Sequence, residues 1–272
     1  MANDTIQVTV RLFAMLRARE RSSTITMRLP SGATVTTLVD RFFSDRPDLV
    51  AMQPHIRVAQ NGTLVARTVD IAPLALRDGD ELALLPPASG GAANGHTQKE
   101  LASALVAVPG GRRIARIMPA PIDGALEAGL VSLIAGEGDG AVVTFVGRTR
   151  ATPGTPAPGE EATAARFAGE RVLELEYEAA AELAEPALAA MCDAILAAAN
   201  GAIGGIGVVH AEGSVPVGAM SLVAVVAAPH RAAAYAASQQ LIDTLKRDAP
   251  IWKLERFESG EVWSANPDAL RR

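Results

Sequence analysis

One stretch is decisive for the fold of the first third of the chain: Leu84-Leu85-Pro86-Pro87-Ala88-Ser89-Gly90-Gly91. Two glycines that follow an apolar strand and a proline pair form a thin, extended arm without side chains. Such an arm suits the entry of a terminal carboxylate into a narrow catalytic channel. The chain runs on to residue 272, so Gly91 carries no free carboxylate while the chain is intact. The residues alone leave open whether the arm is a tail awaiting exposure or only a linker.

The residues before the arm predict a small α+β roll. Polar and apolar residues alternate near the N-terminus, as they do in half-buried strands. Asn61-Gly62 is the strongest short signal for a hairpin turn. The expected elements are, in order, strands at 6–13 and 24–29, a helix at 35–43, and strands at 56–59 and 82–85.

A change in composition separates this roll from the rest of the chain. Residues 92–113 are rich in small and polar residues, which predicts a linker with Gly110-Gly111 as a turn inside it. The expected domains are therefore 1–91 and 114–272, joined by this linker. Within the second domain the patterns predict strands at 141–146, 172–178, 203–210 and 221–227, helices at 182–199 and 232–247, and a closing hairpin at 252–263. Residues 151–170 predict an inserted loop that either acts as a lid or hangs in solvent.

Composition limits the function. With a net charge of −5 the chain offers no general attraction for nucleic acid, so an anion site must be a local cluster of Lys and Arg. The single Cys192 lies in an Ala-rich helical pattern and is expected to be buried and inert. The histidines and this cysteine show no metal-ligand spacing, so no metal site is expected. No apolar run is long enough to span a membrane and no leader is apparent, so a soluble, cytoplasmic protein is expected.

Basic residues follow two predicted strands of the second domain. Arg148 and Arg150 come directly after a buried strand, and their planar forks suit phosphate and other oxyanions. His230 and Arg231 follow another strand at the start of a helix, where anions are favoured. The competing interpretation of His230 is a surface histidine without a role.

Two lysines lie on either side of Pro250. Lys246 ends a predicted helix and Lys253 lies in the strand that follows, so both can point at one pocket. A lysine in a dry, cation-rich pocket has a lowered pKa and can act as a general acid, a base or a nucleophile. The competing interpretation is that Lys246 only complements the helix dipole on a solvated face.

Two long stretches resemble a known enzyme family. The segment from Ile6 to Gly91 is similar to the small, ubiquitin-like sulfur-carrier subunit of molybdopterin synthase, and residues 114–263 resemble its large catalytic subunit. The motifs that carry the second likeness are Gly140–Arg150, Leu175-Glu176-Tyr177-Glu178, Pro229-His230-Arg231, Leu245-Lys246 and Ala249–Glu255. The resemblance implies an α+β fold, in which an N-terminal ubiquitin-like β-grasp domain is fused to an α+β molybdopterin synthase catalytic-subunit domain of the α/β-hammerhead type.

The resemblance implies a sulfurtransferase of molybdenum cofactor biosynthesis. The terminal glycine of the carrier, here Gly91, is expected to be adenylated and converted to a thiocarboxylate by a separate adenylating and sulfurating enzyme. The catalytic part then passes that sulfur, twice, to cyclic pyranopterin monophosphate and so makes the dithiolene of molybdopterin. No tightly bound cofactor is implied, because the sulfur travels as the Gly91 thiocarboxylate.

The resemblance also implies an active site. Lys246 matches a catalytic lysine and is expected to be the acid–base or transient acyl-accepting group, while Lys253 orients substrate and stabilises charge. The residues that match or adjoin the family's substrate pocket are Phe145, Arg148, Thr149, Arg150, His230, Arg231, Leu254 and Glu255. The family's His-Arg-x-Gly run appears here as His210-Ala211-Glu212-Gly213, without the arginine.

The internal position of Gly91 leaves several modes of action open. The carrier mechanism requires cleavage of the Gly91–Ala92 bond by a processing protease, and linkers of small polar residues are favoured cleavage sites. The alternative is an uncleaved fusion whose first domain is a structural or inhibitory docking module, with a separate carrier supplying the sulfur. A third possibility is a vestigial first domain. The resemblance further implies a homodimer through the catalytic domains, and neither a nucleic-acid nor a membrane partner.

Overall fold

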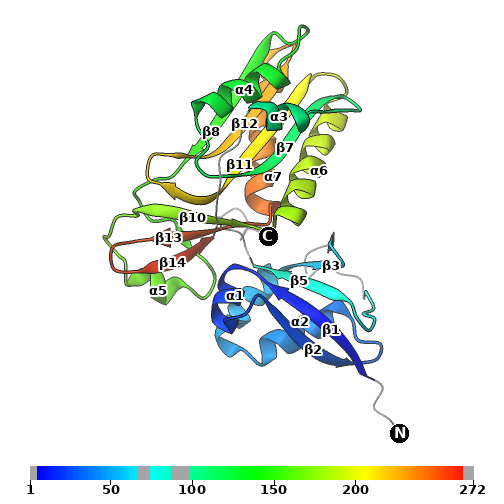
Figure 1. Ribbon diagram of the computed structural model, residues 1–272, viewed down its shortest axis with the longest axis vertical. Coiled ribbons are helices and arrows are strands. Elements are labelled where there is room, and N and C mark those ends of the chain that lie inside the picture. The colour runs from blue at the N-terminus through cyan, green and yellow to red at the C-terminus, as the bar shows by residue number, and fades with distance from the viewer. Residues whose placement is uncertain (1–4, 66–73, 87–97, 266–272) are drawn as a thin grey trace.

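The computed structural model describes residues 5–65, 74–86 and 98–265. Residues 5–86 form the first unit, a mixed five-stranded sheet in the order β2-β1-β5-β3-β4, covered by helices (Figure 1). The last strand, β5, lies parallel to β1 in the middle of the sheet, which is the β-grasp arrangement. Its elements are β1 (Thr5–Leu12), α1 (Ala14–Glu20), β2 (Thr24–Pro30), α2 (Val35–Ser44), the 3₁₀ helix η1 (Pro47–His55), β3 (Arg57–Gln60), β4 (Thr63–Val65) and β5 (Glu81–Leu85).

Local sequence accounts for helix α2. Thr34 caps its first turn, with the Thr34 side chain accepting from the Thr37 amide and the Thr37 side chain accepting in return from the Thr34 amide. Leu38 and Phe42 recur at helical spacing and are fully buried against the sheet. The helix therefore begins and packs where the pattern predicts.

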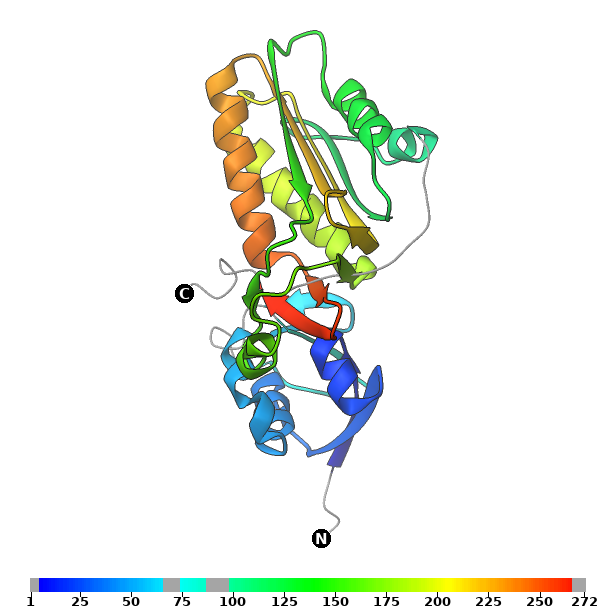
Figure 2. The same ribbon diagram turned by 90° about the vertical axis from the view of Figure 1, so that its left-hand side faces the viewer.

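Residues 98–265 form the second unit, whose main sheet is covered on both faces. Helices α6 and α7 cover one face and α3 and α4 the other (Figure 2). The main sheet contains β6, β7, the first half of β11, β12 and β8. These elements are α3 (Gln98–Ser103), β6 (Val106–Val108), β7 (Gly111–Pro119), α4 (Gly124–Ile134), β8 (Ala141–Arg148), α6 (Ala181–Ala199), β11 (Gly205–Pro216), β12 (Met220–Ala228) and α7 (Arg231–Asp248).

A smaller sheet lies between this layer structure and the first unit (Figure 1). The second half of β11 leaves the main sheet and pairs with β10, so one strand joins both sheets. The small sheet continues in the order β10-β13-β14-β9. Its elements are β9 (Thr155–Pro156), β10 (Glu174–Ala179), β13 (Ile251–Arg256) and β14 (Glu261–Ala265), with the short helix α5 (Glu161–Ala165) beside them.

The structure changes two details of the domain prediction. Residues 98–113, predicted as linker, fold with the second unit: Leu101 is buried in its core and Gly110-Gly111 turns the β6–β7 hairpin. Helix α4, which the sequence patterns did not predict, is capped by Asp123 through the amides of Ala125 and Leu126. Within the described ranges, no helix is both long and apolar enough to cross a membrane.

Candidate active site

Strand β13 gives the small sheet two different faces. Successive side chains of a strand point to opposite faces, and residues directly opposite in antiparallel strands share a face. Lys253 lies opposite Tyr177 on β10 and opposite Ser264 on β14. This face, which also carries Glu255, is called the lysine face. The other face, with Trp252 and Leu254, turns toward the first unit and is called the docking face.

Lys253 lies at the centre of a cluster of charges. Burial lowers the pKa of its ammonium, the Glu255 carboxylate opposes this, and the nearby Arg150 and Lys246 lower the pKa further. The Lys253 Nζ lies 3.9 Å from Oε1 of Glu255, whose side chain is only 4% exposed. Lys246, in the last turn of α7, and Arg150 are both exposed. The structure therefore brings Arg150, Lys246, Lys253 and Glu255 together, and three of the four are cations.

Glu255 is held by the chain segment that follows Arg150. The amide of Gly154 donates to both carboxylate oxygens of Glu255, at 3.0 Å each. No sequence signal marked Gly154, because its neighbours form an irregular run without periodicity. Tyr177 is buried, and burial raises the pKa of its hydroxyl, which lies among Ser221, Thr149 and Glu255.

The two residues that precede Arg150 are engaged with a neighbouring turn. Arg148 donates from Nε to the carbonyl of Gly218 at 2.7 Å. Thr149 is buried and exchanges backbone hydrogen bonds with Ala219 and Gly218. These bonds hold the end of β8 in place, and so they also fix the backbone from which the Arg150 side chain extends.

His230 and Arg231 lie at the opposite end of the main sheet. His230 is the N-cap of α7, and Lys246 lies near the end of the same helix. With a rise of 1.5 Å per residue, the start of α7 is roughly 22 Å from Lys246. Both side chains are exposed. Within one copy of the chain, His230 and Arg231 therefore lie away from the lysine cluster. The sequence predicts these residues and the lysines in the same substrate pocket.

Other predicted residues lie at the edge of the site or outside it. Phe145 is half-buried on β8, and its ring edge lies beside Gly147. The side chain of Leu254 belongs to the docking face, because strand alternation turns it away from Lys253. His210 is buried and burial lowers its pKa to about 4, so it is neutral near pH 7 and has a structural position. Burial raises the pKa of Cys192 to about 12, which agrees with an inert thiol.

Gly91 lies outside the described residues, which reach Pro86 at the start of the arm. The indole Nε1 of Trp252 donates to the carbonyl of Pro86, the last described residue of the first unit before the arm. Trp252 is fully buried and its ring stacks on Phe13, with ring centroids 5.4 Å apart. The base of the arm is thus bound by the residue that precedes Lys253.

Ion pairs surround this apolar contact. Glu178 of β10 accepts from the Ala14 amide at 3.1 Å and pairs with Arg17 at 2.5 Å. Arg11 pairs with Glu182 at the start of α6. Basic side chains of the first unit therefore meet acidic side chains of the second, which is electrostatic complementarity across a docked interface.

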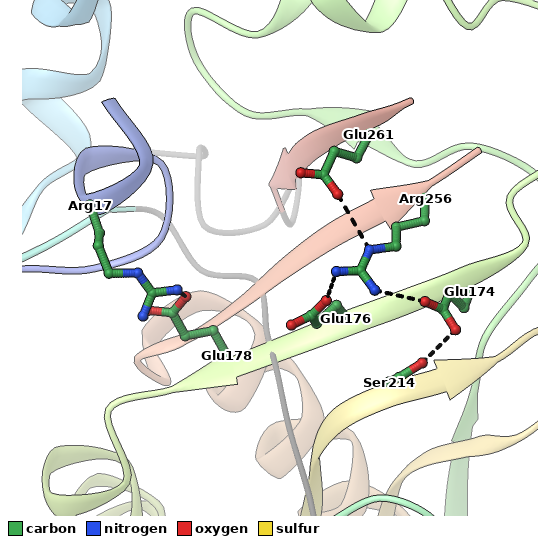
Figure 3. A network of polar contacts seen from close by, with 7 residues as sticks. All are labelled: Arg17, Glu174, Glu176, Glu178, Ser214, Arg256 and Glu261. Carbon is green, nitrogen blue, oxygen red and sulfur yellow. Dashed lines mark hydrogen bonds and ion pairs between the residues drawn. The ribbon is translucent and has the colours of Figure 1, made fainter. Parts of the chain in front are cut away.

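The rest of the docking face forms its own polar network (Figure 3). Arg256 pairs with Glu174 at 2.9 Å, with Glu261 at 3.3 Å and also with Glu176, while Ser214 donates to Glu174. The hydrogen bonds to Glu174 and the other carboxylates raise the pKa of the Arg256 guanidinium. Figure 3 shows Arg17 and Glu178 as a separate pair, away from this network.

No group of three or more His, Cys, Asp or Glu side chains within the described ranges is arranged to hold a metal ion. The side chains that the site offers are a lysine with a lowered pKa, a second lysine, an arginine and an anchored carboxylate. Such a set can bind an oxyanion and move protons.

Comparison with known proteins matches both units to families. The ThiS family model matches residues 10–91, and the MoaE protein family model matches residues 121–248. The protein of Oryza sativa subsp. indica called molybdopterin synthase catalytic subunit is 38% identical over 133 residues, which cover 49% of this chain and 61% of the rice protein. This chain therefore spans less than two thirds of that relative.

Two solved structures align with parts of the chain. Molybdopterin synthase from Staphylococcus aureus aligns with 28% identity and a TM-score of 0.47, covering 56% of this chain and 96% of that chain. SAMP1 from Haloferax volcanii aligns with 32% identity and a TM-score of 0.26, covering 31% of this chain and 99% of that chain.

Proposed function

We propose that the chain is a molybdopterin synthase with its own sulfur carrier, because residues 10–91 match the ThiS family model and residues 121–248 match the MoaE protein family model. The first unit carries sulfur as a thiocarboxylate on Gly91, after cleavage of the Gly91–Ala92 bond. The second unit transfers that sulfur to cyclic pyranopterin monophosphate. The observation that carries the proposal is the position of Trp252, which holds the Pro86 carbonyl while the adjacent Lys253 enters the cation cluster.

The geometry supports delivery of the arm to the lysine face. Gly91 is the fifth residue after Pro86, and five extended residues reach about 17 Å. Trp252 and Lys253 are consecutive residues of β13. A carrier docked as the first unit is docked therefore begins its arm beside the residue that precedes Lys253.

The proposed chemistry has two steps for each sulfur. The thiocarboxylate sulfur forms a bond to a substrate carbon, the carbon–oxygen bond there breaks, and the departing oxygen takes a proton from a lysine. Water then adds to the resulting thioester and the acyl–sulfur bond breaks. The sulfur stays on the substrate as a thiol, and Gly91 returns as a carboxylate. A second loaded carrier repeats the sequence.

The side chains of the lysine cluster suit these steps. Lys253 has a lowered pKa and readily gives up a proton, and as an ammonium it stabilises negative charge that develops on the acyl oxygen. Lys246 is exposed at the end of α7 and has the freedom to approach the acyl group as acid–base or transient acceptor. Arg150 adds a fork for the substrate phosphate.

A homodimer would place His230 and Arg231 of one copy beside the lysine cluster of the other. These residues lie roughly 22 Å from Lys246 in one copy, so they can join a lysine cluster only from a second copy. Strand β8 is an outer strand of the main sheet among the described strands and is rich in apolar residues, with Val142 40% exposed. An apolar strand edge of this kind favours contact with another chain.

Mass and activity measurements test the proposal. The chain is purified from cells that contain the whole molybdenum cofactor pathway, and its intact mass is measured. A fragment that ends at Gly91, partly heavier by the exchange of one oxygen for sulfur, is expected. An unbroken chain that makes molybdopterin only with an added separate carrier would instead favour a docking role for the first unit.

Mixing two inactive variants tests the dimer. Lys253→Ala and Arg231→Ala chains are expected to be inactive alone and to recover part of the activity when mixed, because mixed dimers hold one intact site. Failure of the mixture to recover activity, with dimers confirmed by light scattering, would contradict a shared site.

A further inference from the structure

The loop 151–170 is folded against both units. Its β9 pairs with β14, and the Ala157 amide donates to the Trp263 carbonyl at 3.1 Å. Further along, Phe167 is buried and stacks on Phe257 with ring centroids 4.7 Å apart. The loop therefore does not hang in solvent. The part from Gly154 to Glu160 is called the strap.

One end of the strap lies in the active site. The Gly154 amide binds both oxygens of Glu255. A Cβ atom at Gly154 would lie 2.6 Å from Oε1 of Glu255 and 3.3 Å from Nζ of Lys253. Only a residue without a side chain lets the backbone approach this carboxylate so closely.

The other end of the strap lies against the first unit. Ala157 is fully buried in the core cluster that contains the first unit's side chains. A Cβ at Gly159 would lie 3.4 Å from the Asp48 carbonyl, so the backbones are in close contact there. Glu160, whose side chain is 10% exposed, pairs with Arg19 of α1 at 3.5 Å.

We propose that Gly154 is a positioning residue that holds Glu255 beside Lys253, and that the strap makes this contact depend on docking of the first unit. When the first unit leaves, Ala157 loses its cover and Glu160 loses Arg19. The strap then has fewer contacts to keep the Gly154 amide on Glu255. The proposal uses the proposed function only in taking Lys253 as an active-site group.

The charges around Lys253 give this coupling a chemical consequence. The groups that act on it are Glu255 on its own strand, Arg150 after β8 and Lys246 on α7. The Tyr177 hydroxyl of β10 lies near Glu255. Glu255 is the one carboxylate in this set. If Glu255 moves away, two cations and burial remain, so the ammonium loses its proton at lower pH. Docking of the carrier would thus keep Lys253 protonated when the acyl group arrives.

The test measures the titration of Lys253 directly in the intact chain. Trace acetic anhydride is added over a range of pH, and acetylation of each lysine is measured by peptide mass spectrometry. Gly154→Ala places a methyl group between Glu255 and Lys253. Gly138→Ala is the matched control, because Gly138 has an ordinary φ and open space around its Cβ position.

A second pair of variants tests the link to docking. Arg19→Ala removes the ion pair with the strap, whereas Arg17→Ala removes an ion pair with Glu178 outside the strap. The stacking of Phe13 on Trp252 keeps the first unit docked in both. Arg19 is on the surface, so this pair remains informative if Gly154→Ala fails to fold.

The expected result is a lower-pH midpoint for Lys253 in Gly154→Ala and in Arg19→Ala, with several-fold faster acetylation at a fixed pH below the wild-type midpoint. Gly138→Ala and Arg17→Ala should titrate as the wild type does. An unchanged midpoint in Gly154→Ala would overturn the positioning role, and equal midpoints in Arg19→Ala and Arg17→Ala would overturn the coupling. Because acetylation needs no sulfur transfer, these outcomes are independent of the proposed activity.

Discussion

The two faces of the small sheet differ in what they recognise, although they share the same strands. The docking face carries Trp252, whose indole stacks on Phe13 and binds the Pro86 carbonyl. The lysine face carries Lys253, surrounded by charge and anchored beside Glu255. Because a strand alternates its side chains, adjacent residues place the contact with the first unit and the charged cluster on opposite faces. A shift of β13 by one residue would exchange the two faces.

Removing the docking anchor should have the largest effect. Trp252→Ala leaves a cavity between the units and an unpaired Pro86 carbonyl, and is expected to cost about 3–5 kcal/mol of unfolding free energy. The measurement is chemical denaturation of the intact chain. Leu254→Ala, on the same face, is the control for a smaller cavity. If Trp252→Ala lowers the free energy of unfolding by less than Leu254→Ala does, Trp252 does not anchor the interface.

Removing the ammonium on the other face should stop the chemistry and spare the fold. Lys253→Met keeps the length of the stem but cannot move a proton, so the rate of sulfur transfer should fall roughly 10²-fold or more. Transfer is measured in a single turnover with a carrier already loaded with sulfur. Docking, followed by the fluorescence of Trp252, should be unchanged. A wild-type rate would exclude Lys253 from the reaction.

The sequence predicts these two faces unequally. Alternation in 251–256 and the likeness of its motif to a known family are enough to place β13 and Lys253. The partner of Trp252 could not be predicted, because a contact between Phe13 and Trp252 joins units far apart in the chain. Helix α4 contains glycines at 124 and 129, which weaken a helical signal.

The sequence predicted which residues form the site better than it predicted where they lie. Arg150, Lys246 and Lys253 meet as the sequence suggests. His230 and Arg231 do not meet them, because they lie at the start of α7 and Lys246 lies at its end. The sequence shows that a residue follows a strand, but it does not show at which end of the sheet that strand ends. The role of Gly154 depends on a close backbone approach, for which irregular sequence gives no periodic signal.

The same lysine variant should change stability in a pH-dependent way. The pKa of Lys253 is lower in the folded chain than its ordinary value of 10.5, because burial disfavours the ammonium. This penalty is complete below the folded pKa and disappears as pH rises toward 10.5. Lys253→Met should therefore be more stable than the wild type at neutral pH, with the difference shrinking as the pH approaches 10.5. Denaturation at several pH values measures this, and a constant difference would contradict burial as the cause.

The charged rim of the docking face should contribute least. Arg17 is 48% exposed and its partner Glu178 only 12%, so the pair is partly screened by solvent. Arg17→Ala is expected to cost about 1 kcal/mol or less at low salt, and less again at high salt. Glu261→Ala is the matched comparison, since it removes an ion pair of Arg256 in the network apart from the Arg17–Glu178 pair. Scattering at increasing salt should show the units of Arg17→Ala separating before those of Glu261→Ala. Equal behaviour would mean that the apolar contact of Phe13 and Trp252 alone holds the carrier, and that the ion pairs only guide its approach.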